Sequence, residues 1–105
     1  MNYLKLEYFY KVAQSQHMTK TAEELHISQP ALTKMIKQLE DELGEDLFYK
    51  KGRGICLTDF GVFLKSKLDN IIPLVNSLQS EIDDYCEEAK RRVKLNVMAA
   101  STIVT

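Results

Sequence analysis

The sequence predicts a mainly α-helical fold in which three short helices and a two-stranded hairpin precede one long helix. Three patterns predict it: residues 19–43 fit two helices joined by a tight turn, residues 51–54 fit a hairpin turn, and a heptad repeat starts at Leu64. A chain of 105 residues suffices for one small domain and an appendage. We therefore expect a globular domain over residues 1–58, a long helix over 59–91 and the beginning of a further domain over 92–105.

The second helix of this 19–43 segment has one apolar and one polar face. Ser28 suits its N-cap because a hydroxyl accepts a free backbone N–H, and Pro30 costs little in a first turn. The apolar stripe contains Leu32, Ile36, Leu39 and Leu43. The opposite stripe carries Pro30, Thr33, Lys34 and Lys37, with Gln29 just ahead of it. Amide, hydroxyl and cationic groups at a helix start suit the major groove of DNA, and a solvated surface is the alternative interpretation.

The preceding helix completes a helix-turn-helix motif over residues 18–37. Thr19 can cap it, and Ala22 is small enough for a close helix crossing. His26 is expected to shape the turn and Ile27 to anchor it, because the two helices cross steeply over a short connection.

A hairpin is predicted after this motif. Residues 47–50 and 55–58 are short runs of apolar and polar side chains on either side of KGRG. Gly52 and Gly54 are both expected to supply positive φ angles, which place Arg53 at the tip. A tip arginine suits a narrow minor groove, where the potential is most negative, and the alternative is a solvated turn with incidental charge.

The long helix is predicted to begin after Thr58, which can cap it, with Asp59 favouring its first turn and Gly61 allowing close approach to the domain. Its heptad positions are Leu64, Leu68, Ile71, Val75, Leu78, Ile82, Tyr85 and Ala89. Because so small a domain cannot cover a helix of about 30 residues, we expect pairing with a second chain, with packing on its own domain as the alternative. Pro73 lies off this stripe and is expected to kink the helix or to cost it the hydrogen bond to Asp69.

Composition and motifs exclude several classes of protein. No apolar run approaches the roughly 20 residues of a membrane span and no signal-peptide pattern is present, so a cytoplasmic protein is expected. Cys56 and Cys86 lack CxxC spacing and are expected to be unpaired thiols. His17 and His26 lack metal-ligand spacing, so we expect no metal site. Without a phosphate-cradling loop or a nucleophile elbow, we expect no catalytic residue and no enzyme.

The charge balance argues against a general affinity for DNA. Residues 1–58 carry eight cations and eight acids, and so lack the basic field typical of DNA-binding domains. The cations are Lys5, Lys11, Lys20, Lys34, Lys37, Lys50, Lys51 and Arg53. The acids are Glu7, Glu23, Glu24, Glu40, Asp41, Glu42, Glu45 and Asp46. Because most of these acids follow the start of the second helix, we expect modest non-specific affinity with a shallow salt dependence, made useful by dimerisation.

Three sequence blocks together resemble the N-terminal winged helix-turn-helix domain of LysR-type transcriptional regulators. The blocks are LEYFYKVAQ at residues 6–14, TKTAEELHISQPALTKMIKQLEDELGEDLF at 19–48 and GRGICLTDFG at 52–61. Several blocks in the right order make this a specific match. The chain departs from the family's pattern at His17, Met18, Lys20 and Thr21, where Ser, Phe, Arg and Ala are usual, and at Lys50 and Cys56, where Arg is common.

The resemblance implies binding to double-stranded DNA. It implies major-groove contacts from Gln29, Pro30, Thr33 and Lys34, a minor-groove contact from Arg53, and phosphate contacts from Thr19, Lys20, Lys37 and Lys50. It also implies a homodimer through the long helix, usually antiparallel, or a tetramer when intact, reading an interrupted inverted repeat. RNA polymerase is a further partner and no membrane is involved. A small-molecule effector would bind a domain missing from this fragment, which itself needs no cofactor.

The last residues are predicted to change character. Residues 94–99 alternate polar and apolar side chains like a strand. Since one short strand cannot bury itself, residues 97–105 are expected to be poorly ordered or to borrow a neighbour.

Three alternative functions remain open at this stage. The first is a winged-helix regulator of another family, such as the molybdate-responsive type. The second is a winged-helix protein-interaction module, which the balanced charge would permit. The third is a structural coiled-coil adaptor in which the globular end is only a cap.

Overall fold

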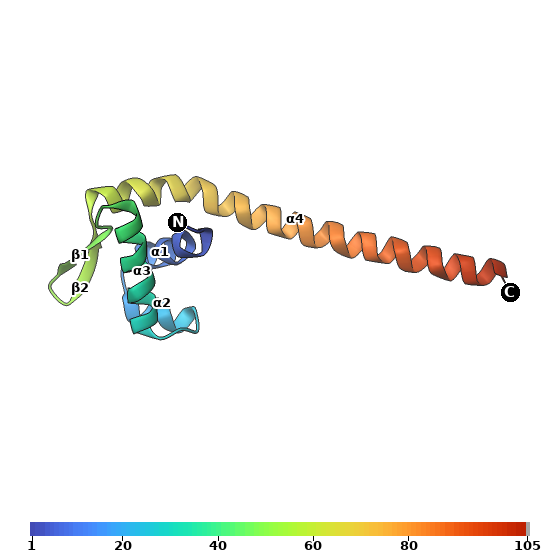
Figure 1. Ribbon diagram of the computed structural model, residues 1–105, viewed down its shortest axis with the longest axis horizontal. Coiled ribbons are helices and arrows are strands. Elements are labelled where there is room, and N and C mark those ends of the chain that lie inside the picture. The colour runs from blue at the N-terminus through green and yellow to red at the C-terminus, as the bar shows by residue number, and fades with distance from the viewer. Residues whose placement is uncertain (105) are drawn as a thin grey trace. The chain divides into compact units, whose positions relative to one another are not determined.

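The computed structural model describes the backbone of residues 1–104 and the side chains of residues 1–97, and it confirms the expected fold class. The elements are α1 (Tyr3–Ser15), α2 (Met18–Glu24), α3 (Gln29–Leu43), β1 (Phe48–Lys51), β2 (Gly54–Leu57) and α4 (Asp59–Val104) (Figure 1). The chain divides into two compact units, Met1–Ile71, which we call the winged domain, and Ile72–Thr105.

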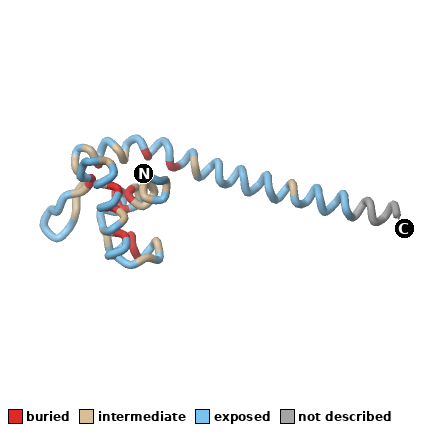
Figure 2. Tube along the Cα trace, viewed as in Figure 1, coloured by how far each residue is buried: buried red, intermediate tan, exposed pale blue. Residues whose placement is uncertain are grey.

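The core of the winged domain lies where α1, α2 and α3 contact one another (Figure 2). Its buried apolar side chains are Phe9, Val12, Ala13, Ala22, Leu32, Ile36, Leu39, Leu47 and Leu68. The rings of Phe9 and Phe48 lie 5.4 Å apart, so the hairpin shares this core. The apolar stripe predicted for α3 is confirmed at Leu32, Ile36 and Leu39, which are each at most 4% exposed, whereas Leu43 is half-buried.

The helix-turn-helix motif formed by α2 and α3 confirms two sequence predictions and corrects a third. Ser28 caps α3 by accepting the Ala31 N–H at 3.2 Å, and His26 adopts a left-handed φ of 58° within the turn. Thr19 does not cap α2, however. The cap is His17, whose Nδ1 accepts the Lys20 N–H at 3.0 Å, so the helix begins one residue before Thr19.

The hairpin, which we call the wing, pairs Lys51 with Gly54 around a two-residue turn. Gly52 has a φ of +61°, but Gly54 is not at positive φ, so the prediction that both glycines need it is wrong for Gly54. A positive φ at only the first central residue is the pattern of a type II′ turn, which matches strand twist and still places Arg53 at the tip.

The first turns of α4 are fixed by contacts within the winged domain. Thr58 Oγ1 accepts the Gly61 N–H at 3.0 Å, which confirms the predicted cap. Tyr10 on α1 donates its hydroxyl to Asp69 at 2.6 Å, and Lys65 lies 5.7 Å from the Tyr10 ring centroid. Leu68 is 2% exposed in this single chain, so it belongs to the domain's own core and is not available to a partner as predicted.

Residues 94–99 are helical, so the predicted strand is wrong. The alternation there is short, and no Gly or Pro follows Pro73 to stop a helix that is already formed. The helix also continues through Pro73. The expectation for residues 97–105 falls largely on side chains outside the described residues.

Candidate nucleic-acid interface

The polar face predicted for the start of α3 is on the surface. Gln29, Pro30 and Lys34 are exposed, whereas Thr33 is half-buried. The Gln29 Nε2 donates to Thr33 Oγ1 at 3.0 Å, so the two side chains are held together. The buried stripe on the opposite side of α3 keeps this face directed outward.

A groove of about 390 Å³ lies between α3 and the wing. It brings together four predicted site residues, namely Gln29, Thr33, Lys37 and Lys50. Its apolar lining comes from Met18, Ile36, Phe48 and Ile55, with Tyr49 and Glu40 completing it. The combination of polar and cationic side chains over an apolar floor suits the edges and methyl groups of bases beside phosphates.

A second hollow of about 250 Å³ joins the start of α2 to the tip of the wing. It brings Thr19 and Arg53 together with Gln29, and no carboxylate lines it. Lys20, Pro30 and Lys34 line neither space and lie exposed on α2 and α3. The nine predicted residues therefore come from α2, α3 and the wing, and six of them converge on two adjoining hollows.

The cations of this surface are free of internal partners. Within residues 1–97, no ion pair involves any of Lys20, Lys34, Lys37, Lys50 and Arg53. Cations without a partner keep their full charge available to an external anion.

The acids at the far end of α3 are partly committed to the fold. Glu40 accepts the backbone N–H groups of Leu47 at 2.6 Å and Phe48 at 3.3 Å, which fixes the start of the wing. Glu42 binds Lys5 at 2.6 Å and the N-terminal amine at 2.9 Å. The hydrogen bond from Lys5 is the main cause that lowers the pKa of Glu42.

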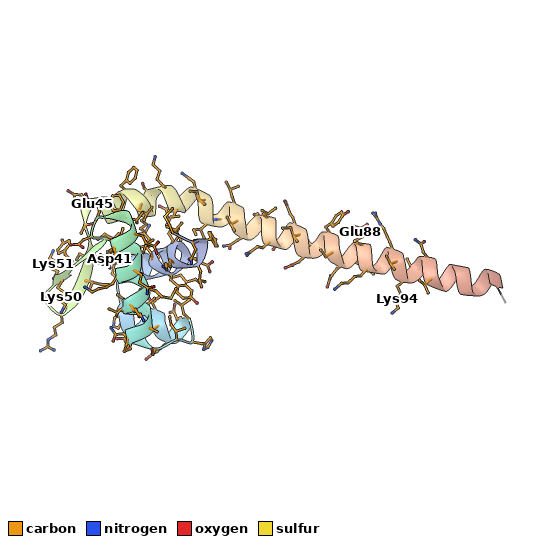
Figure 3. The ribbon with its side chains drawn as sticks, viewed as in Figure 1. Asp41, Glu45, Lys50, Lys51, Glu88 and Lys94 are labelled. Carbon is orange, nitrogen blue, oxygen red and sulfur yellow. The ribbon has the colours of Figure 1, made fainter. Side chains whose placement is uncertain are left out.

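The remaining acids of α3 and the loop after it gather at the C-terminal end of this helix. Asp41, Glu45 and Asp46 line a hollow of about 410 Å³ at the C-terminal end of α3. Figure 3 labels Glu45 beyond the end of α3, Asp41 on α3, and Lys50 and Lys51 on the wing. The balanced net charge of the domain thus includes a cluster of acids at one end of α3, although Glu40 also lines the groove that holds Lys37 and Lys50.

Sequence reasoning missed three exposed side chains of this surface, Gln16, His17 and Tyr49. Tyr49 is 49% exposed and lines the groove beside Lys50, and an aromatic residue next to a lysine in a predicted strand was the available signal. His17 lines the second hollow, but histidine is not a usual N-cap and gave no such signal. Among the described residues, no cluster of ligating side chains could hold a metal ion. None of the described helices is long and apolar enough to cross a membrane.

Comparison with protein families gives a match over residues 4–62 to the model described as "Bacterial regulatory helix-turn-helix protein, lysR family". The nitrogen assimilation regulatory protein nac of Escherichia coli is 42% identical over 98% of this chain and 35% of its own length. The transcriptional regulator PcaQ of Agrobacterium fabrum is 39% identical over 82% of this chain and 27% of its own length.

Solved structures give the same result. The BenM DNA-binding domain in complex with benA site 1 DNA has a TM-score of 0.74 and 31% identity, covering 82% of this chain and 97% of that one. The CbnR DNA-binding domain in complex with DNA has a TM-score of 0.69 and 33% identity, covering 77% of this chain and 93% of that one. The chain spans about a quarter to a third of the length of the curated relatives it matches.

Proposed function

This chain belongs to the lysR family of bacterial regulatory helix-turn-helix proteins, and we propose that it is a sequence-specific DNA-binding transcriptional regulator that acts as a dimer or a dimer of dimers. Family membership rules out the molybdate-responsive type considered above. The observation that carries the proposal is the partner-free polar and cationic surface formed by α2, α3 and the wing. The DNA complexes of BenM and CbnR, which share this fold, support it.

In this proposal the start of α3 enters the major groove. Gln29 pairs with adenine edges, the Pro30 ring or the Thr33 methyl touches a thymine methyl, and Lys34 contacts base edges. The hydrogen bond from Gln29 to Thr33 holds the amide in a defined orientation before DNA arrives, which reduces the entropy lost on binding. These contacts supply the sequence specificity.

The surrounding groups position the domain on the duplex. Arg53 at the tip of the wing enters the minor groove, where the potential is most negative. The phosphate contacts come from Thr19, Lys20, Lys37 and Lys50, which fix the register without reading bases. The acidic end of α3 stays clear of the duplex because only the first turns of the helix enter the groove.

Self-association is assigned to α4. Beyond the winged domain the predicted stripe is uncovered in the single chain, with Leu78 53%, Ile82 49% and Tyr85 72% exposed. The stripe also includes Ile71 and the half-buried Leu64 and Val75, but not Leu68. Two such helices paired across a twofold axis would present two recognition helices to an interrupted inverted repeat.

The rest of the proposal follows from the family and from the shorter span of this chain. A small-molecule effector would bind a part of the longer protein that these residues do not include, and contact with RNA polymerase would follow from binding beside a promoter. We infer a cytoplasmic location, where bacterial DNA lies, and no enzymatic reaction.

A mobility-shift experiment with the intergenic DNA beside the gene tests the DNA-binding role. Lys34→Glu should lose at least tenfold in affinity for DNA and reduce the slope of log K against log salt by about 1. The reason is that a cation placed at the major groove of the DNA is replaced by an anion. Lys11→Glu makes the same charge change at an exposed residue of α1, outside the surface formed by α2, α3 and the wing, and should change affinity less than threefold. Equal behaviour of the two variants, or no shift by the unsubstituted chain, would favour a protein-interaction module instead.

A further inference from the structure

One ring nitrogen of His17 accepts a backbone hydrogen bond that caps α2, and the other makes no hydrogen bond within the described residues. Its Nδ1 accepts the Lys20 N–H at 3.0 Å, and a nitrogen that accepts a hydrogen bond carries no proton. The neutral ring must therefore carry its proton on Nε2. Among residues 1–97 this Nε2–H has no acceptor, and the residue is exposed.

The ring is also held in place before any ligand binds. The backbone N–H of His17 donates to Ser15 Oγ at 3.1 Å, and Ser15 Oγ shares a hydrogen bond with the hydroxyl of Thr21. Thr21 is only 1% exposed, so the connection between α1 and α2 is tied to the buried core. A donor fixed at both the backbone and the ring loses little freedom when it forms one further hydrogen bond.

The surroundings of His17 suit an anion. It lines the 250 Å³ hollow with Thr19, Gln29 and Arg53, and no carboxylate lines this space. The hydroxyl, the amide and the guanidinium are all able to donate hydrogen bonds into it. Arg53 adds a positive charge, and no acid among the described side chains forms an ion pair with it.

The proposed function places a phosphate strand at this hollow. If α3 lies in the major groove and the wing in the adjacent minor groove, the sugar-phosphate strand that separates the two grooves passes between them. The hollow joins the start of α2 to the tip of the wing, which is the gap that this strand would cross.

We propose that His17 donates its Nε2–H to a phosphate of that strand and so positions the domain on DNA. The inference rests on the proposed function and adds a contact to it. A phosphate contact of this kind strengthens binding to every sequence and does not read bases.

The test uses the whole chain, the intergenic duplex of the mobility-shift experiment and a variant that separates capping from phosphate binding. His17→Ser keeps an efficient N-cap and removes the imidazole Nε2–H donor. We expect its Kd to rise about tenfold with an unchanged thermal midpoint and unchanged base preference, since a hydrogen bond to a charged group is lost.

A second measurement identifies the phosphate. Neutral methylphosphonate is introduced at single positions of the duplex. One position should weaken binding by the unsubstituted chain about tenfold yet leave His17→Ser unaffected, because that variant makes no contact there.

Each other outcome overturns the inference. Equal affinity of the two chains, additive losses at every phosphate, or a changed base preference in His17→Ser would each remove the phosphate contact. If the thermal midpoint falls with affinity, His17→Gly, a tolerated N-cap that has no side-chain donor, must restore the midpoint and not the affinity; restoring both would show a role in folding alone. An unsubstituted chain that binds no duplex would refute the proposed function itself, which the mobility shift detects separately.

Discussion

Gly61, at the start of α4, occupies a position where even one methyl group does not fit. A Cβ built at this residue would lie 2.3 Å from the Leu47 carbonyl oxygen and 2.9 Å from the Leu57 Cδ2. Real Cβ contacts stay above 3.0 Å, so α4 and the wing would have to separate by about 0.7 Å. The carbonyl cannot simply rotate away, because it accepts the Thr58 N–H at 3.0 Å.

Gly61→Ala should therefore destabilise the winged domain. Overpacking of this kind costs about 2–3 kcal/mol, and the better helix propensity of alanine recovers about 1 kcal/mol. The net loss of about 1–2 kcal/mol corresponds to a thermal midpoint lower by about 5–15 °C for a domain of this size.

Gly54→Ala is the matched control, because its Cβ would meet nothing closer than 3.9 Å and its φ is not positive. It should be neutral, or stabilising by less than about 1 kcal/mol. The assay is thermal unfolding followed by circular dichroism at 222 nm. A midpoint for Gly61→Ala equal to that of Gly54→Ala would refute the close approach of α4 to the wing.

Three further predictions concern other parts of the chain. Leu68→Ala should lower the free energy of unfolding by about 3 kcal/mol in a urea titration, since this side chain is only 2% exposed. Leu78 is 53% exposed, so Leu78→Ala should raise the dimer dissociation constant measured by sedimentation. It should change the free energy of unfolding of the monomer by no more than about 0.5 kcal/mol. The pKa of Glu42 is lowered by its hydrogen bond with Lys5, so its contribution to stability is complete above its ordinary value of 4.5 and is lost as pH falls from there through the lowered folded value. Glu42→Gln should flatten the decline of unfolding free energy in that range, and an unchanged pH profile would contradict the pairing. Pro73→Ala restores a backbone donor inside α4 and should raise helicity and stability by up to about 3 kcal/mol, and a loss of stability would instead show that the helix requires the proline.

The second half of the helix-turn-helix motif was predictable because its signals are local. Ser28 caps the helix and Pro30 lies in its first turn, as the sequence indicates. The buried stripe follows directly from the helical period. The start of α2 was misplaced because the cap is an imidazole and Thr19 looked like a better cap than His17. Capping preferences derived from the sequence favour the common cap residues, and α2 is capped by a rarer one, a histidine.

The long helix shows what a sequence repeat alone cannot predict. A heptad repeat identifies apolar positions, but it cannot say whether a given side chain faces its own domain or a second chain. Leu68 and Leu78 both lie on the apolar heptad stripe, yet Leu68 is buried in the winged domain and Leu78 is exposed. The difference depends on how Gly61 and the bond from Tyr10 to Asp69 orient the first turns of α4, which are tertiary facts.

The balance of charge is the wrong quantity for judging whether the winged domain can bind DNA. Net charge treats every acid as equally able to repel a phosphate, but the acids here have different positions and partners. Glu40 is occupied by two backbone donors that hold the wing, and Glu42 by two cations, one of them Lys5. Because exposed charges are screened beyond about 10 Å, a phosphate near the start of α3 responds to the partner-free cations around it more than to acids at the other end of the helix. The same acids that cancel the formal charge thus help to build the scaffold that presents Lys34 and Arg53.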